Sequence, residues 1–154
     1  MAEILKYLAK LPTPLTAVTL IVGDEGAGTL ELANLLLQQI TDYHLRVHTA
    51  TRLPLPEDGA ASRPNFDFVI FLLDITRMES FKQTEEALQY VDVAYFHGRS
   101  CLIVNGAKKP DRWANDYSIV EELANAYNLQ IICCQLEDEE DGAVVRRRLT
   151  APAI

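Results

Sequence analysis

One stretch, residues 15–40, constrains the fold of this chain more than any other. An apolar segment over residues 15–22 has the pattern of a strand, residues 23–28 read Gly-Asp-Glu-Gly-Ala-Gly, and the pattern from Thr29 onward is helical. A strand, a glycine-rich turn and a helix in this order form the loop that cradles phosphate in many nucleotide-binding proteins. Gly23 and Gly28 keep the spacing of that loop.

The two positions that follow the glycines depart from the phosphate-loop pattern. Thr29 stands where a lysine would contact phosphate, and Leu30 stands where a hydroxyl would hold magnesium. A lysine ammonium about 4 Å from a phosphate oxygen contributes about 4 kcal/mol in an intermediate dielectric, so its loss lowers affinity roughly a thousandfold. We therefore interpret Gly23, Gly28, Thr29 and Leu30 as a degenerate phosphate loop kept as a structural turn, and we expect no cofactor.

Two other interpretations of the loop stay open at this point. The first is a nucleotide site of unorthodox composition. The second is a Rossmann-type dinucleotide turn built on Gly23, Gly26 and Gly28, although no acidic residue ends the second predicted strand.

Length and composition predict one domain over residues 1–154. The chain is 49% apolar and carries a net charge of -8, which argues against a nucleic-acid surface because such a surface needs a basic stripe. Three cysteines (Cys101, Cys133 and Cys134) fall in predicted strands, and an odd number in buried positions predicts reduced thiols in an intracellular protein. The spacing of histidines and cysteines does not favour a metal site, and we expect neither a signal peptide nor a membrane span.

The rest of the sequence alternates strand patterns with helix patterns. We predict strands over residues 44–50, 66–74, 100–105 and 129–135, helices that begin at capping boxes on Ser80 and Ser118, and a short final helix over residues 139–149. The helix after the glycine loop is expected to bury most of its circumference. This alternation predicts an α/β fold with a mainly parallel sheet and helices on both faces. The order of elements resembles a small GTPase, a P-loop NTPase-like fold, with an abbreviated middle.

The other motifs of a GTPase are degenerate. No aspartate is followed by glycine three residues later, and in the nearest candidate, residues 74–77, Arg77 stands where backbone must approach phosphate. Residues 105–108 read Asn-Gly-Ala-Lys, so a glycine replaces the lysine of the guanine motif and Lys108 replaces its base-selecting carboxylate. These losses predict that the protein is not an enzyme. A degenerate, low-affinity GTPase-type switch is the alternative.

Several short motifs resemble the centromere protein M family, and together they cover most of the chain. The resemblance is most specific over residues 53–106, which contain Leu53-Pro54-Leu55-Pro56, Arg63-Pro64, Thr84-Glu85-Glu86 and Val91-Asp92. It implies a pseudo-GTPase that neither binds nor hydrolyses nucleotide and serves as a structural subunit of the inner kinetochore, in the nucleus. The implied complex contains centromere proteins H, I and K, with the helical-repeat protein I as direct partner, and supports kinetochore assembly and chromosome segregation. The family extends somewhat further at the C-terminus than this chain.

The predicted partner-binding residues are Tyr95, Phe96, His97 and Arg99. Two aromatic side chains and an arginine belong to the residue types that dominate binding hot spots. The alternative is that Tyr95 and Phe96 complete the hydrophobic core. Trp113, in a polar loop, is a second candidate with the same alternative.

Overall fold

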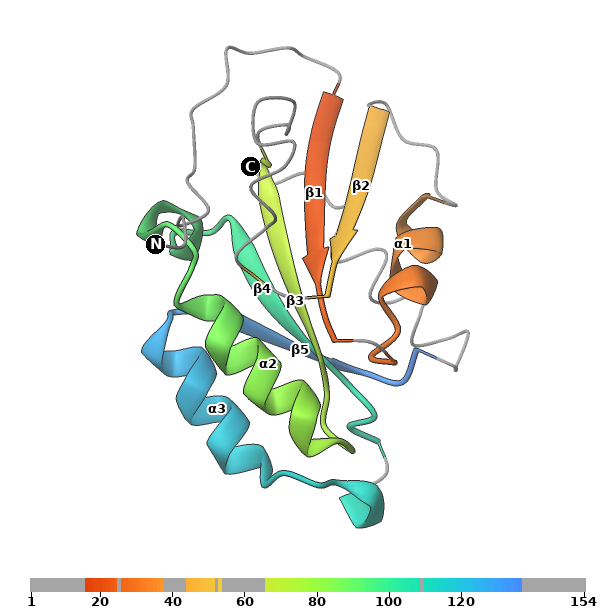
Figure 1. Cartoon of the computed structure of the whole chain (residues 1–154), viewed down its shortest axis with the longest axis vertical. Helices are drawn as coiled ribbons and strands as arrows, with labels where there is room; N and C mark the ends of the chain where they lie inside the picture. The colour runs from red at the N-terminus through yellow and green to blue at the C-terminus, as the bar shows by residue number, and fades with distance from the viewer. Residues whose placement is uncertain are drawn as a thin grey trace.

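The computed structural model describes residues 16–24, 26–37, 44–51, 53, 66–108 and 110–136 of the chain (Figure 1). The strands are β1 (Thr16–Val22), β2 (His44–Ala50), β3 (Phe68–Asp74), β4 (Ser100–Asn105) and β5 (Gln130–Cys134). The helices are α1 (Thr29–Leu37), α2 (Met78–Leu88) and α3 (Tyr117–Ala126), with short 3-10 helices η2 (Val93–Phe96) and η3 (Pro110–Arg112). The predicted helix over residues 139–149 and the segment over residues 54–65 lie outside the described residues.

The described strands form one parallel sheet in the order β2-β1-β3-β4-β5. This confirms the predicted α/β class and is consistent with an abbreviated small-GTPase-like fold. The strand order reverses between β1 and β3. In open sheets of this kind, ligands bind at the carboxyl ends of the strands beside such a reversal.

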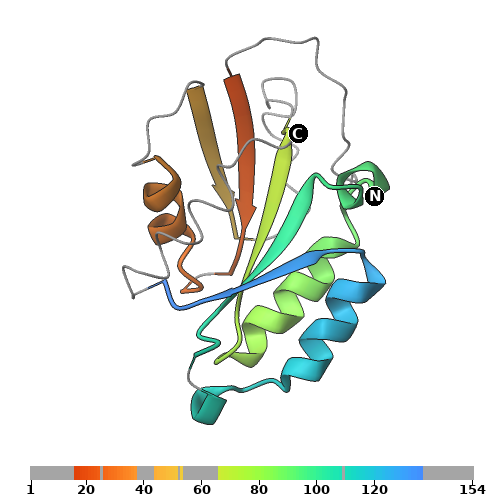
Figure 2. The same ribbon diagram turned by 180° about the vertical axis from the view of Figure 1, so that it is seen from behind.

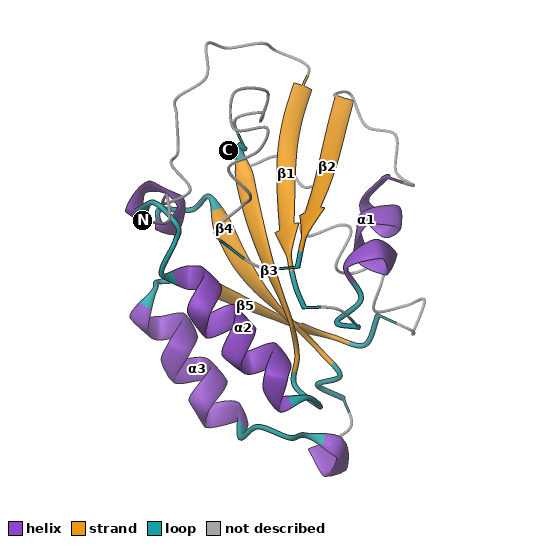
Figure 3. Cartoon of the chain, in the orientation of Figure 1, coloured by secondary structure: helices purple, strands orange, loops and turns teal. Residues whose placement is uncertain are grey.

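Helices cover both faces of the sheet, as predicted. Figure 3 shows α2 and α3 side by side, with α1 apart from them beside β2, and Figure 2 shows the same arrangement from behind. Along β3, Val69, Phe71 and Leu73 belong to the core cluster under α2 and α3, whereas Ile70 and Leu72 belong to the cluster under α1. Alternate side chains of a strand point to opposite faces, so a strand covered on both faces needs the continuous apolar run seen here.

Both predicted capping boxes are wrong. Helix α2 begins at Met78 and has Arg77 at the N-cap, without a side-chain capping bond, whereas Ser80 is buried and its hydroxyl accepts from the Asp74 N–H at 2.8 Å. At α3 the N-cap is Asp116, whose carboxylate accepts from the Ser118 N–H at 3.2 Å. Each serine therefore lies inside the first turn of its helix rather than before it.

Two expectations about burial are also wrong. Helix α1 buries only Leu32, Ala33 and Leu36, while Leu30 is 68% exposed and Leu37 51% exposed, so this helix covers the sheet with one stripe. Among the cysteines, Cys101 and Cys134 are buried but Cys133 is exposed. Neighbouring residues of a strand face opposite sides, so two adjacent cysteines in β5 cannot share one environment.

Candidate functional site

The degenerate phosphate loop connects β1 to α1 at the carboxyl edge of the sheet, beside the reversal of strand order. A Cβ atom at Gly23 would lie 2.8 Å from Thr29 Cγ2 and 3.0 Å from the Leu72 carbonyl oxygen, so only glycine permits this close approach to β3. Gly28 has φ +104, a conformation that glycine adopts without strain. Thr29 therefore packs on Gly23, while Leu30 is largely exposed on the first turn of α1.

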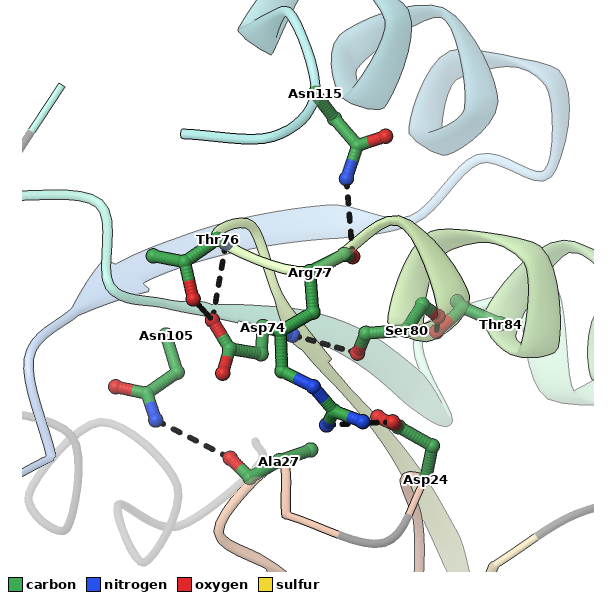
Figure 4. A network of polar contacts seen from close by, with 9 residues as sticks. All are labelled: Asp24, Ala27, Asp74, Thr76, Arg77, Ser80, Thr84, Asn105 and Asn115. Carbon is green, nitrogen blue, oxygen red and sulfur yellow. Dashed lines mark hydrogen bonds and ion pairs between the residues drawn. The ribbon is translucent and has the colours of Figure 1, made fainter. Parts of the chain in front are cut away.

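An ion pair closes this loop against the start of α2. Arg77 Nη1 lies 2.7 Å from Asp24 Oδ2, and the two side chains point toward each other across the edge in Figure 4. A Cβ atom at Gly26 would lie 3.0 Å from Arg77 Nη1, so the guanidinium lies against the glycine loop itself. The chain therefore places its own cation beside the turn where the pattern would place a ligand's phosphates.

Asp74, at the end of β3, is bonded within its own turn. Its Oδ1 accepts from the Thr76 N–H at 3.0 Å and from the Thr76 hydroxyl at 2.6 Å. In addition, the carbonyl of Arg77 accepts from Asn115 Nδ2 at 3.2 Å (Figure 4), which ties the start of α2 to the segment before α3.

Asn105, at the end of β4, connects two neighbouring loops. Its Nδ2 donates to the Ala27 carbonyl at 3.2 Å, and its Oδ1 accepts from the Leu136 N–H at 2.9 Å. This asparagine begins the degenerate guanine motif, and its side chain joins the glycine loop to the segment that follows β5.

The predicted partner-binding stretch lies at the opposite, amino edge of the sheet, because η2 precedes β4 whereas the degenerate loop follows β1 (Figure 1). Tyr95 is fully buried and Phe96 is 8% exposed. The Tyr95 hydroxyl donates to the Phe66 carbonyl at 2.9 Å, and the ring of Phe96 packs on Tyr127 with centroids 5.3 Å apart. These two aromatic residues belong to the core, which was the alternative interpretation.

His97 and Arg99 are exposed in the turn between η2 and β4. Val93, which the sequence did not single out, is 68% exposed in η2. Trp113 is partly buried, packs against the core beside Tyr117 and donates from Nε1 to the Gly106 carbonyl at 3.2 Å. The structure thus leaves His97 and Arg99 as the accessible members of the predicted surface.

Sequence reasoning noted Asp24 and Arg77 separately but did not pair them. The available signal was an opposite charge just after each of two strands that are neighbours in the sheet, and recognising it requires the strand order. Within the described residues, no group of three or more His, Cys, Asp or Glu side chains could hold a metal ion. None of the described helices has the length and apolar character needed to cross a membrane.

Comparison with known proteins gives one consistent result. The family model described as Centromere protein M matches residues 2–152. The human Centromere protein M is 34% identical over 147 residues, which cover 96% of this chain and 81% of the human protein. Similar relatives with the same name occur in Bos taurus, at 33% identity over 94% of this chain, and in Xenopus laevis, at 28% over 91%.

Proposed function

Because the chain belongs to the centromere protein M family, we propose that it is a non-enzymatic structural subunit of the inner kinetochore that binds no nucleotide. The main support for this pseudo-GTPase role is the occupancy of the carboxyl edge by the chain's own side chains. Arg77 lies against Gly26 of the degenerate phosphate loop and pairs with Asp24 of the same loop.

The proposed partners are centromere proteins I, H and K, in the nucleus at the centromere and kinetochore, with the helical-repeat protein I in direct contact. The accessible residues His97 and Arg99 carry the proposed contact, since Tyr95 and Phe96 are held in the core. Exposed Val93 adds an apolar group from the same segment. Arginine is one of the residue types that dominate binding hot spots, so Arg99 is the main residue of the proposed contact.

Nucleotide binding is tested by thermal unfolding with and without GTP or GDP and magnesium. A ligand at about 100 times its Kd would stabilise the protein by about 2.7 kcal/mol, so we expect no change in Tm at millimolar nucleotide. Nucleotide content after gentle purification gives a second measurement. A stabilised Tm would favour the alternative, a degenerate GTPase-type switch, for which the retained Asn105 bridge is the supporting observation.

Partner binding is tested by titrating a complex of centromere proteins H, I and K with Arg99→Glu and His97→Ala. Loss of a hot-spot side chain costs about 2 kcal/mol, so we expect Kd to rise roughly thirtyfold for Arg99→Glu. Arg112→Glu is the matched control, because it reverses an exposed arginine in η3, which follows the carboxyl end of β4. If Arg99→Glu and the unchanged chain bind with equal affinity, the amino edge of the sheet is not part of the interface.

A further inference from the structure

The Asp24–Arg77 pair joins the two loops that flank the reversal of strand order. Asp24 follows β1, and Arg77 immediately precedes α2. The Asp24 side chain is only 2% exposed, while that of Arg77 is 36% exposed. Asp24 Oδ1 is buried and accepts no hydrogen bond within the part of the chain that the structure describes. Arg77 therefore supplies the positive charge that compensates the buried Asp24 carboxylate.

Backbone contacts hold both members of the pair in place. The Asp24 carbonyl accepts from the Ala27 N–H at 3.0 Å, which closes the turn of the glycine loop. The Arg77 N–H donates to the Asp74 carbonyl at 3.1 Å, and the Arg77 carbonyl accepts from Asn115 at 3.2 Å. Because both backbones are held by hydrogen bonds, forming the ion pair costs less backbone entropy than forming one between two mobile loops.

Helix capping does not account for an arginine at this position. Arg77 is the N-cap residue of α2 and makes no side-chain capping bond. The amino end of a helix carries partial positive charge, so a cation there is disfavoured unless an anion compensates it. Asp24 supplies that anion from a different loop, which points to a role in joining the two loops.

We propose that Arg77 takes over the role that phosphate and magnesium have in a nucleotide switch, namely joining the two loops at the carboxyl edge. Through Asp24 it holds the β1–α1 loop against the start of α2, so the carboxyl edge keeps one conformation without a ligand. In nucleotide switches the phosphate orders such segments, and hydrolysis releases them. Hydrolysis cannot release Arg77, because its side chain is covalently part of the protein. The inference deepens the proposed absence of nucleotide binding and rests on it.

The proposal predicts an asymmetry between the two partners. Removing the guanidinium leaves a buried carboxylate without its counter-charge, which is strongly destabilising. Removing the charge of Asp24 leaves a guanidinium that is already one-third exposed, so water solvates part of its charge. Arg77→Met should therefore disturb the edge more than the isosteric Asp24→Asn.

Hydrogen exchange of the full chain under native conditions tests this. The reporter is the Ala27 amide, which donates within the glycine loop, and the Leu102 amide in β4, an inner strand between β3 and β5, reports global opening. We expect exchange at Ala27 to rise roughly tenfold in Arg77→Met and less in Asp24→Asn, while exchange at Leu102 stays much slower than at Ala27, as it does when the opening is local. The double variant Asp24→Asn/Arg77→Met should exchange more slowly than Arg77→Met alone, because it buries no unpaired charge.

Arg112→Met serves as the matched control and should leave Ala27 exchange unchanged. If Arg77→Met does not fold, Arg77→Lys keeps the charge but loses the planar guanidinium, and we expect it to give an intermediate exchange rate. Unchanged exchange in both Arg77 variants, or effects that simply multiply in the double variant, would overturn the proposal. Failure of the proposed function has a different signature, namely slower Ala27 exchange in the unchanged chain when GTP and magnesium are added.

Discussion

Two residues with aromatic rings at the C-terminal end of η2 lie in opposite environments. Tyr95 is buried under the sheet and bonded to Phe66, whereas His97, two positions later, is exposed. A tyrosine suits a core and an interface equally well, since it combines a large apolar ring with one polar group. Only the position of the side chain relative to the sheet separates these roles.

Substitution of Tyr95 should lower the free energy of unfolding rather than act directly on partner affinity. Tyr95→Ala removes a fully buried ring, so we expect a loss of about 3–5 kcal/mol in the free energy of unfolding. Tyr95→Phe keeps the ring but leaves the buried Phe66 carbonyl without this donor, and we expect a loss of about 1–2 kcal/mol. Urea unfolding measures both. A stable Tyr95→Ala variant with weakened partner binding would restore Tyr95 to the interface.

The Asn105 side chain also carries a testable prediction, because both polar atoms of its amide form hydrogen bonds. Asn105→Ala removes the donor to Ala27 and the acceptor for Leu136, and we expect a loss of about 1–3 kcal/mol. Asn105→Asp keeps the acceptor but turns a carboxylate oxygen toward the Ala27 carbonyl, so it should not recover stability at neutral pH. Chemical denaturation measures both variants. Asn125→Ala, an exposed change in α3, is the control, and equal stability of all variants would contradict the bridging role.

At the scale of elements, the types of the described helices and strands agree with the sequence pattern, but the starts of α2 and α3 do not. The pattern placed both starts on serines that precede suitable capping-box partners. In the structure, an aspartate two residues earlier caps α3, and the corresponding serine of α2 turns inward to Asp74. Several side chains within one turn could cap each helix, and tertiary contacts determine which of them does so.

The cap of α3 can be tested by comparing two neighbouring positions. Asp116→Ala removes the carboxylate that accepts from Ser118, and we expect a loss of about 0.5–2 kcal/mol. Ser118→Ala changes an exposed residue inside the helix, and we expect an effect within about 0.5 kcal/mol. Thermal or urea unfolding of the two variants decides between them. A larger loss of stability from Ser118→Ala than from Asp116→Ala would show that the serine is the capping residue.

For the whole molecule, burial of Cys101 couples stability to pH. Burial raises the pKa of the Cys101 thiol from 9.0 to about 12. Between these values the unfolded chain releases the thiol proton and the folded chain retains it. This contribution to stability is therefore fully present below about pH 9 and is lost as the pH rises toward about 12.

Cys101→Ala isolates that contribution. Urea unfolding between about pH 8 and 10.5 should show the unchanged chain losing roughly 1 kcal/mol per pH unit more than the variant above about pH 9. The slope is the readout, because the substitution also removes buried volume and shifts the whole curve. Parallel curves for the two proteins would show that the folded thiol titrates normally.

Much of the fold could be predicted because hydrophobic periodicity is a local property. The apolar run of β3 required cover on both faces, and the glycine spacing predicted a strand, a turn and a helix over residues 15–40. The exposure of Leu30 and Leu37 could not be predicted, because a leucine-rich helix does not show how much of it the sheet covers. The loss of phosphate-binding residues from the candidate site could be predicted, since a sequence shows directly that Thr29 and Leu30 stand in place of the lysine and the hydroxyl residue.

The sequence by itself determined the fold class, the family and the absence of the residues that grip phosphate, because each is written in residue types and spacings along the chain. The tertiary structure alone decided what lies beside the glycine loop. Asp24 and Arg77 are 53 positions apart and meet because β1 and β3 are neighbours in the sheet. Contact between distant residues depends on strand order and register, which emerge only when the whole chain packs.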